Sequence, residues 1–301
     1  MSASVFDTLT GSAQNVLMNR KIHRRGILGA VAASPLLFWT GGSARAATTA
    51  TAAGSPAPRI PRGFEGVDPR TATRVPLWQE LAPTVPIFPG DPPFTSTVFT
   101  TIPVSGYLLE QITSLGTHTG THISAPAHFV EGAPALSQLD ESWTLMPLVV
   151  IDVRARVTAS GGDFQVDTAA LKAFERAHGT IPAGGCVLLL TGFARNYTSA
   201  TRPGRADDYF DPAPGFTGES VAWLFGTRGI KAVGSDTFGP DATSDEAFSA
   251  TSTALHHGGI TVENVGPGLA RMRPYGDWVS INGGRPRFSG FQMGITGFTA
   301  P

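Results

Sequence analysis

The chain has 301 residues, of which 41% are apolar and 15% charged, so it can bury a sizeable core. Its net charge of −1 argues against a nucleic-acid-binding protein, which needs a basic surface. The single cysteine, Cys186, excludes an internal disulfide. Because Cys186 begins the apolar run Cys-Val-Leu-Leu-Leu, it is expected to be a buried and unreactive thiol on a strand.

Residues 1–46 contain, in order, the three features of an export signal. Arg24 and Arg25 precede a modest apolar run at 30–39, and a small-residue cleavage site ends at Ala46. The paired arginines predict a twin-arginine signal peptide and a protein exported to the periplasm or the extracellular space. The apolar run is short and interrupted by a proline, so no membrane anchor is expected after cleavage. The alternative is an amphipathic N-terminal helix.

Residues 47–72 are predicted to be a linker, since this stretch opens on a run rich in Ala, Thr, Ser, Gly and Pro. Residues 73–301 contain no internal repeat and are predicted to form the functional domain. The proline-rich run 86–93 is expected to be a rigid loop, because proline cannot complete helix or ladder hydrogen bonds.

The remaining pattern is one of short strands and a few helices. Helices are predicted at 167–177 and 220–226, the second with Thr217 as its N-cap. The predicted strands are 74–78, 96–102, 107–112, 148–153, 186–190, 230–234, 260–262, 278–281 and 291–298. This order predicts an α/β fold, a single domain in which a mixed β-sheet or part-barrel is flanked by a few helices.

Three histidines lie close together in the segment that follows the predicted hairpin. His118, His122, Ser124 and His128 share even parity, so an extended chain directs them to one side. Two histidines spaced i, i+4 can chelate one divalent metal, and a third can be a further ligand or a general base. The alternative is a chance cluster of polar loop residues.

This segment, His118-Thr-Gly-Thr-His122-x-x-x-Pro126-x-His128-Phe129, resembles the signature of the cyclase family, which includes bacterial kynurenine formamidase and isatin hydrolase. Shorter pieces of the family pattern follow in the family's order, at 86–91, 190–193, 232–237 and 262–264. The resemblance covers roughly residues 75–298. It implies a swivelling β/β/α fold, a small-molecule substrate and a homo-oligomer.

The resemblance also implies roles for single residues. His118, His122 and Glu263 would bind a divalent metal, Zn or Mn, and His128 would be the general acid/base. A water molecule activated by that metal would attack the substrate carbonyl while His128 carries the proton. The alternative for Glu263 is an ordinary exposed strand end.

This chain departs from the family pattern at two positions. Ser124 stands where the family has a metal-binding Asp, and Thr251 stands where it has a metal-binding His. A neutral hydroxyl cannot easily bridge two dications, so at most one metal is expected. His256 or His257 could replace the missing ligand, or both could lie on a solvated loop. Asp236, at a predicted strand end, is either a carboxylate that orients the site or a structural turn residue.

Three functions fit these observations. The first is a metal-dependent, kynurenine formamidase-like hydrolase of the C–N bond of a small aryl formamide or cyclic amide. The second is a secreted cyclase or dehydratase of secondary metabolism that relies on His128 with little help from a metal. The third is a non-catalytic descendant that binds a small molecule in a metal-poor pocket. Aromatic residues available to line such a pocket are Phe88, Phe94, Phe129, Trp143 and Phe238.

Overall fold

The computed structural model describes residues 60–68, 70–197 and 212–301. The predicted signal peptide, residues 1–46, and most of the predicted linker lie outside the described residues. Within the described ranges no helix combines the length and apolar character needed to cross a membrane.

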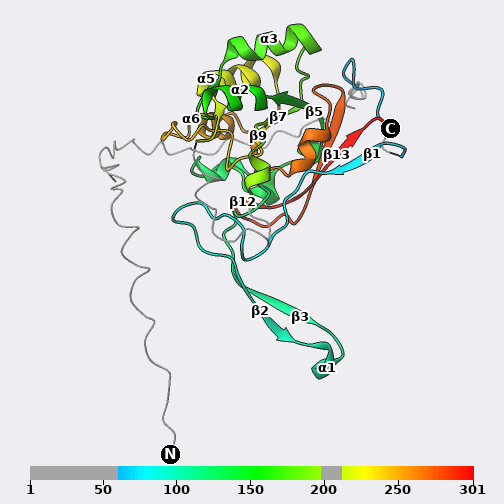
Figure 1. Cartoon of the computed structure of the whole chain (residues 1–301), viewed down its shortest axis with the longest axis vertical. Coiled ribbons are helices and arrows are strands. Elements are labelled where there is room, and N and C mark those ends of the chain that lie inside the picture. The colour runs from blue at the N-terminus through cyan, green and yellow to red at the C-terminus, as the bar shows by residue number, and fades with distance from the viewer. Residues whose placement is uncertain (1–59, 69, 198–211) are drawn as a thin grey trace, which may run out of the picture. The chain divides into compact units, whose positions relative to one another are not determined.

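A mixed nine-stranded sheet is the centre of the described chain (Figure 1). Its four consecutive strands β5, β7, β9 and β10 are parallel, and the strands outside them pair antiparallel. In spatial order the strands are β1 (Thr73–Pro76), β13 (Gly294–Thr299), β11 (Asp277–Asn282), β5 (Leu145–Asp152), β7 (Cys186–Leu190), β9 (Ala232–Ser235), β10 (Ile260–Glu263), β4 (His122–Ser124) and β12 (Gly290–Gln292).

The main helices gather on one side of the sheet (Figure 1). They are α2 (Arg154–Ser160), α3 (Thr168–His178), α5 (Gly218–Trp223) and α6 (Ser249–His256). A small pair of parallel strands, β6 (Gln165–Val166) and β8 (Gly215–Phe216), lies in the same part of the chain. The predicted α/β domain with a mixed sheet and few helices is therefore confirmed.

Side chains that point alternately to the two faces of the parallel strands divide the hydrophobic core into two clusters. Leu148 and Val150 of β5 join the cluster that also contains Ile123 of β4 and Val262 of β10. The odd-numbered neighbours on β5, such as Val149, join the second cluster, which packs against the helices. Successive side chains on a strand point to opposite faces, so each strand that is buried on both faces is a continuous apolar run.

Local sequence explains the helix starts that were predicted correctly. The Thr217 hydroxyl accepts a hydrogen bond from Ser220 N at 3.0 Å, and Asp167 caps α3 through Ala170 N at 2.8 Å. Helix α6 was missed because its Ser- and Thr-rich sequence has low helix propensity. Its first amides are instead satisfied by Asp241, which lies nine residues away from Ala250.

The packed chain starts before residue 73. Phe64 and Val67 fall in the range predicted as linker, yet both are buried. Phe64 packs against Tyr275 and Trp278, and its carbonyl oxygen accepts a hydrogen bond from Trp278 Nε1 at 3.0 Å. The sequence signal for a linker comes from the stretch before residue 60, so residues 60–72 belong with the domain.

The predicted hairpin is present, with one addition. Strands β2 (Thr95–Thr100) and β3 (Leu109–Ser114) pair antiparallel as a separate two-stranded ribbon. The short helix α1 (Ile102–Ser105) closes it and ends at Gly106, which has a φ of 82°. A left-handed residue at this helix end favours glycine. Figure 1 shows the ribbon extending away from the sheet.

Candidate active site

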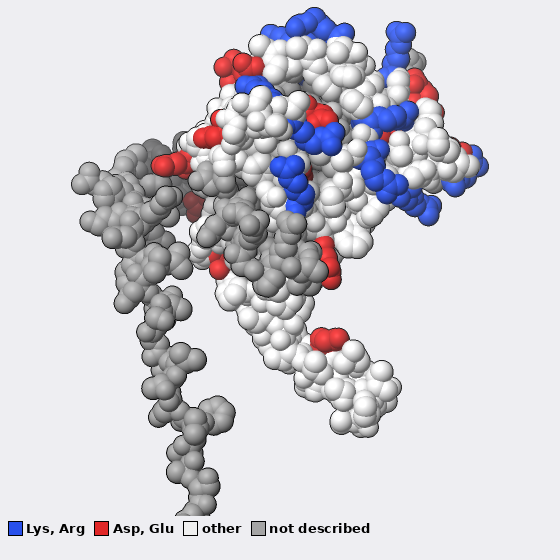
Figure 2. Space-filling view, in the orientation of Figure 1, with Lys and Arg blue, Asp and Glu red and all other residues white. Residues whose placement is uncertain are grey.

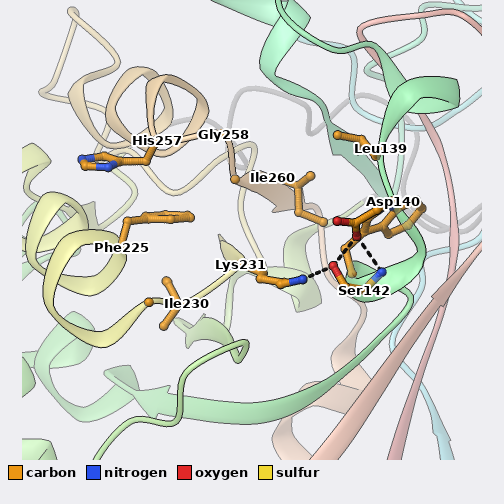
Figure 3. Close-up of a pocket in the computed structure, with 12 residues that line it drawn as sticks. Leu139, Asp140, Ser142, Phe225, Ile230, Lys231, His257, Gly258 and Ile260 are labelled. Carbon is orange, nitrogen blue, oxygen red and sulfur yellow. Dashed lines mark hydrogen bonds between the residues drawn. The ribbon is translucent and has the colours of Figure 1, made fainter. Parts of the chain in front are cut away.

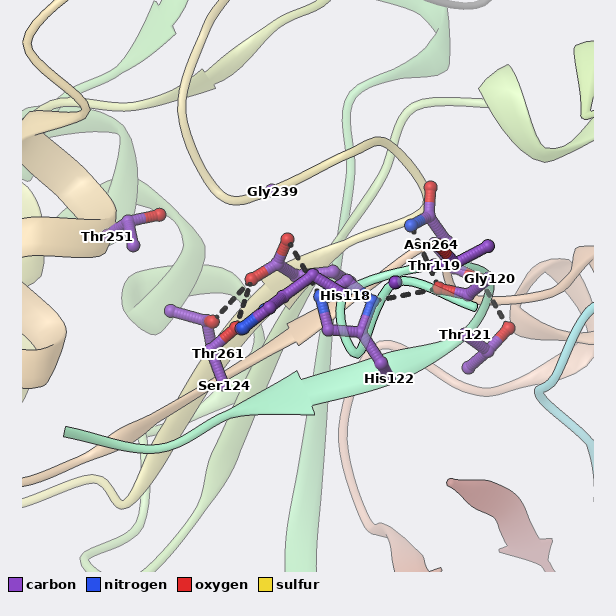
Figure 4. Close-up of polar contacts among 12 residues, drawn as sticks. His118, Thr119, Gly120, Thr121, His122, Ser124, Gly239, Thr251, Thr261 and Asn264 are labelled. Atoms are coloured by element: carbon purple, nitrogen blue, oxygen red, sulfur yellow. Dashed lines mark hydrogen bonds and ion pairs between the residues drawn. The ribbon is translucent and has the colours of Figure 1, made fainter. Parts of the chain in front are cut away.

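Strand β4 carries the histidine segment into the sheet between β10 and β12. Its register places His122 directly opposite Glu263 and Ser124 opposite Thr261 of β10. On the other side, Ser124 is opposite Gly290 of β12. Two segments that are 139 residues apart in sequence are thus held side by side by backbone hydrogen bonds, and their polar side chains meet at the end of β10 (Figure 4).

His122 is buried with one ring nitrogen engaged and the other not. Its Nδ1 donates to the carbonyl oxygen of Gly120 at 2.8 Å, which fixes the tautomer that leaves a lone pair on Nε2. Gly120 has a φ of 71°, a left-handed conformation that favours glycine, and its oxygen also accepts from Asn264 Nδ2 at 3.0 Å. His122 Nε2 is buried and makes no hydrogen bond within the described residues.

Glu263 is the carboxylate that faces His122 Nε2. Its Oε2 lies 3.4 Å from His122 Nε2, while its Oε1 accepts from Ser124 Oγ at 2.9 Å and from Thr261 Oγ1 at 2.7 Å. Burial alone raises the pKa of Glu263, but His122 and the hydrogen bond from Thr261 lower the pKa to about 2. In return, the carboxylate raises the pKa of His122 against the opposing effect of burial. The carboxylate is therefore ionised at neutral pH.

This pair fits two ligands of one divalent metal. Ligands held at about 2.0–2.2 Å in tetrahedral geometry are separated by roughly 3.3–3.5 Å, which matches the 3.4 Å between Nε2 and Oε2. The second ring nitrogen of His122 is oriented by a carbonyl, as is usual for metal-binding histidines. An orphaned buried nitrogen beside an ionised carboxylate is the observation that supports the fit.

His118, the third predicted metal ligand, lies beside this pair and hydrogen bonds to two serines. Its Nδ1 lies 3.1 Å from Ser124 Oγ and its Nε2 lies 3.0 Å from Ser289 Oγ. The hydroxyl proton of Ser124 goes to Glu263, which has no proton to give, so His118 Nδ1 donates to Ser124 and Nε2 accepts from Ser289. Burial and the neighbouring His122 lower the pKa of His118 to about 3. His118 is therefore a neutral link in a hydrogen-bond chain.

No three His, Cys, Asp or Glu side chains converge as a metal-ligand set in the part of the chain that the structure describes. Of the predicted trio, His122 and Glu263 face each other and His118 lies beside them.

Ser289 could not be predicted from the sequence, because it follows no motif and reaches the site only through the register of β12. Gly290 next to it makes room for the His118 ring, since a Cβ there would lie 2.3 Å from Cε1.

His128 lies on the same side of the site as His118. It ends a short 3₁₀ turn, Pro126–His128, and its ring stacks on His118 with centroids 3.9 Å apart. Burial lowers the pKa of His128, although the nearby Glu263 partly opposes this. His128 is therefore neutral at pH 7 and able to accept a proton, as expected for the predicted general acid/base.

Thr251 faces the site from helix α6, and its neutral hydroxyl is a weak metal ligand. Its hydroxyl and its backbone N–H both donate to the Asp241 carboxylate. A Cβ on Gly239 would lie within 3.8 Å of Thr251 Oγ1, Asp241 Oδ2 and Glu263 Oε2, so these three groups surround the same space. Burial raises the pKa of Asp241 to about 6. Asp241 could not be predicted from the sequence, because it belongs to a loop with no recognised motif.

Two roles were proposed for Asp236, and its contacts support the structural one. It is fully buried and accepts from Thr191 N at 2.8 Å, Thr191 Oγ1 at 2.6 Å and Gly192 N at 2.9 Å. Burial raises the pKa of Asp236, and these donors oppose the rise. Asp236 thus fixes the loop that follows β7.

His256 and His257 do not replace the missing ligand. Both precede β10, whereas Glu263 is its last residue. His256 Nδ1 donates to Ser252 O at 2.8 Å within its own helix. His257 stacks on Phe225 and lines a separate cavity with Lys231 (Figure 3).

A chain of aromatic side chains extends from His128 at the histidine site. Phe88 lies 5.9 Å from Phe238 and 6.2 Å from Phe248 between ring centroids, and Phe129 lies 6.3 Å from Phe248. Phe129 also contacts His128 edge-on at 4.9 Å. Of the predicted lining residues, Trp143 belongs instead to the buried core. Phe88, Phe129 and Phe248 are each more than a third exposed, so they form an apolar rim open to a ligand.

Comparisons with known proteins agree with this geometry. The Cyclase family model matches residues 72–242, more than half of the chain. The kynurenine formamidase of Bacillus mycoides is 26% identical over 196 residues, which cover 65% of this chain and 83% of that protein. The isatin hydrolase of Roseibium aggregatum is 31% identical over 132 residues, 42% of this chain and 49% of that protein. The structure of isatin hydrolase A from Ralstonia solanacearum superimposes with a TM-score of 0.69 at 25% identity, covering 77% of this chain and 93% of that chain.

Proposed function

The chain belongs to the Cyclase family, and on that basis we propose that it is an amide hydrolase that cleaves the C–N bond of a small aryl formamide or cyclic amide. One observation carries the proposal. The buried Nε2 of His122 makes no hydrogen bond and faces the ionised Glu263 carboxylate at 3.4 Å, while His118 lies edge-on to His122 and the neutral His128 stacks on His118. These groups can bind a divalent metal and transfer a proton.

The residues that would hold a divalent metal, Zn or Mn, are His122 and Glu263. Bound there, the metal would act as a Lewis acid toward the substrate carbonyl and lower the pKa of a water molecule. Ser124 and Thr261 hold Oε1 of Glu263, which leaves Oε2 directed at His122. We propose one metal, since Ser124 offers a neutral hydroxyl at the position where a bridge between two dications would need a carboxylate.

The proton transfers are assigned to His128. As a neutral base it takes a proton from the attacking water, whose oxygen bonds to the amide carbonyl carbon. It then gives that proton to the amide nitrogen as the C–N bond breaks. The products are a carboxylate, or formate, and an amine, and the second proton of the water is lost to solvent or to the amine when the carboxylic acid ionises. His118 supports the ring of His128 by stacking and is held in turn by Ser124 and Ser289.

The aromatic rim supports a flat substrate. Phe129, which contacts His128, and Phe248 and Phe88, which follow it ring to ring, expose 37%, 40% and 38% of their surface. Offset or edge-on contact between aromatic rings favours an aryl group over an aliphatic one of similar size. An aryl formamide or an isatin-like lactam presents such a ring beside the bond to be cleaved.

The test is hydrolysis of N-formylkynurenine and of isatin by the chain from Ala47 onward, with Zn or Mn and after treatment with a chelator. We expect turnover of at least one of them that is lost on chelation and restored by metal. Hydrolysis unchanged by chelation would contradict the role proposed for the metal. No hydrolysis of either substrate by the metal-loaded protein would contradict the proposed hydrolase, and calorimetric binding without turnover would support a non-catalytic descendant.

We also propose that the protein is exported, because Arg24 and Arg25 precede an apolar run and a small-residue site. Fractionation of cells that express the full chain tests this directly. Replacing both arginines by lysine should keep the protein in the cytoplasm, and export of that variant at the normal level would contradict the twin-arginine route.

A further inference from the structure

A second cavity lies at the opposite end of strand β10 from the histidine site. Strand β10 begins at Ile260, which lines the cavity, and ends at Glu263. Lys231 also lines the cavity and immediately precedes strand β9, which runs parallel to β10. The volume of the cavity is about 280 Å³, close to the lower end of the range for small-molecule sites, about 300 Å³. The cavity is therefore a candidate binding site that is separate from the proposed active site.

Lys231 brings a cation without a counter-ion into this cavity. Figure 2 shows Lys and Arg side chains spread over the surface of one face of the described chain, whereas Lys231 is partly buried in the wall of the cavity. Its Nζ donates to the Ser142 hydroxyl (Figure 3), and it forms no ion pair within the described residues. An ammonium group has three N–H donors, so two of them are available to a ligand. A partly buried charge is normally paired, which favours an anionic ligand here.

Asp140 limits the charge that this ligand can carry. Ser142 stands between the two charged groups, because its hydroxyl accepts from Lys231 and donates to Asp140 Oδ1. Ser142 N donates to the same oxygen at 2.7 Å, while Asp140 Oδ2 accepts no hydrogen bond within the described residues. Because Asp140 also lines the cavity, it would repel a phosphate dianion or a dicarboxylate. Its Oδ2 is able to accept a hydrogen bond from an amino group of the ligand.

The remaining wall of the cavity is aromatic and aliphatic. Phe225, Ile230 and Ile260 are buried side chains that line it. The ring of His257 stacks on Phe225 with an angle of 12° between the ring planes, and its nitrogens make no hydrogen bond within the described residues. Trp143 adds a second large aromatic side chain to the wall. A wall of this kind favours an aromatic ring as the body of the ligand.

We propose that this cavity binds a small aryl carboxylate that carries an amino group. The carboxylate accepts hydrogen bonds from Lys231, the ring lies against the apolar wall, and the amino group donates to Asp140. Hydrolysis of a cyclic aryl amide yields such a molecule, because cleavage of the C–N bond within the ring leaves a carboxylate and an amine on one product. In this respect the proposal rests on the proposed function, and the cavity is then a product site separate from the active site.

Fluorescence titration of the chain from Ala47 onward with 2-aminobenzoate tests the proposal. We expect saturable binding with a Kd of about 1 mM or lower, which Lys231→Met should weaken at least about 10-fold. Lys231→Arg should retain most of the affinity, because it keeps the charge. Lys172→Met is the matched control, since Lys172 is exposed on helix α3 and its replacement should have no effect. His122→Ala should also leave the affinity unchanged, because the ligand does not occupy the histidine site.

Three further probes test the class of ligand. Benzoate, which lacks the amino group, and aniline, which lacks the carboxylate, should each bind at least about 3-fold more weakly than 2-aminobenzoate. Inorganic phosphate should not displace 2-aminobenzoate, because Asp140 repels a dianion. Equal affinity for benzoate or for aniline, or displacement by phosphate, would overturn the proposed ligand class.

The absence of saturable binding at millimolar 2-aminobenzoate would overturn the proposal, as would a Lys231→Met variant with normal affinity. Loss of binding in His122→Ala would place the ligand in the histidine site and overturn it as well. Circular dichroism checks that each variant keeps its fold. None of these readouts requires turnover, so failure of the proposed hydrolase function would leave them interpretable.

Discussion

Ser124 Oγ donates a hydrogen bond of 2.9 Å to Glu263 Oε1 inside the sheet. The family that this chain resembles has a carboxylate at the position of Ser124, so this site keeps one buried carboxylate beside His122 rather than two. The hydroxyl also accepts from His118, which links Ser289, His118, Ser124 and Glu263 in one chain of hydrogen bonds. The substitution is therefore built into a consistent local structure.

Replacing Ser124 by Asp should make folding depend on metal. A second carboxylate would meet Glu263 Oε1 at about hydrogen-bond distance, and two buried like charges should cost about 1–3 kcal/mol in the free energy of unfolding without metal. Added Zn or Mn should restore the loss. Denaturant unfolding with chelator and with metal measures both effects. Ser124→Asn is the neutral control, and equal destabilisation by Asn would contradict a role of charge.

Replacing His128 by Gln should lower kcat by about 10²–10⁴-fold with an unchanged far-ultraviolet spectrum, as expected for loss of a general acid/base. The wild-type rate should rise with pH as His128 loses its proton. Because burial lowers the pKa of His128 from its ordinary value of 6.5, the acidic limb of the pH profile should have its midpoint below pH 6.5. A midpoint above that value would contradict the assignment.

Replacing Gly290 by Ala should damage activity more than stability. The added methyl would lie 2.3 Å from Cε1 of His118, so the ring must move, and with it the stacked His128. Misplacing catalytic groups by about 1 Å can cost about 10²-fold, so we expect kcat to fall by about 10–100-fold. Gly294→Ala is the control, since its methyl would meet only Asn282 O at 3.4 Å. Equal activity of both variants would contradict the proposed packing.

A fourth prediction concerns stability away from the site. Arg228 donates two hydrogen bonds to Glu175, at 2.6 and 2.7 Å, and lowers the pKa of that carboxyl. Because the folded-state pKa is depressed, the pair stabilises the protein above the ordinary value of 4.5, and the stabilisation disappears as pH falls through the folded-state pKa. Arg228→Met should therefore lower the free energy of unfolding by about 1–2 kcal/mol at pH 7.

The difference between this variant and the wild type should shrink as the pH falls below 4.5 and through the lowered folded-state pKa of Glu175. Chemical denaturation at pH 7 and at a series of acidic pH values measures the difference. Arg228→Lys should retain part of the stabilisation, since it keeps the charge and loses the paired donors. A difference between Met variant and wild type that does not change with pH would show that Arg228 acts through packing on Trp223 instead.

The fold could be predicted wherever the sequence of a single segment indicates the secondary structure of that segment. Apolar runs such as 148–153 and 186–190 predicted the parallel strands, and the membership of the Cyclase family predicted from the histidine segment is confirmed. Helix α6 was not predictable, because the Ser- and Thr-rich segment 249–256 is stabilised by Asp241 from another loop. The position of Phe64 in the core was hidden for a similar reason, since it depends on the distant Tyr275 and Trp278.

The sequence predicted which residues form the site better than it predicted the contacts between them. The sequence identified His122, Glu263 and His128, which the structure brings into one region. It could not show that His118 hydrogen bonds to Ser289, because this pairing arises only when β12 aligns with β4. Asp241 and Phe248 were missed because their roles depend on how α6 packs above Glu263, a long-range arrangement without a local pattern.

The most direct test of the account measures metal content and hydrolysis on the same samples. The chain from Ala47 onward is stripped with a chelator, reloaded with increasing Zn or Mn, and assayed by mass spectrometry of the metal and by cleavage of N-formylkynurenine and isatin. The account predicts activity that rises in proportion to bound metal and levels off at about one metal per chain, and a His122→Ala variant that binds and cleaves almost nothing. Full hydrolysis by the stripped protein, or by His122→Ala, would contradict it.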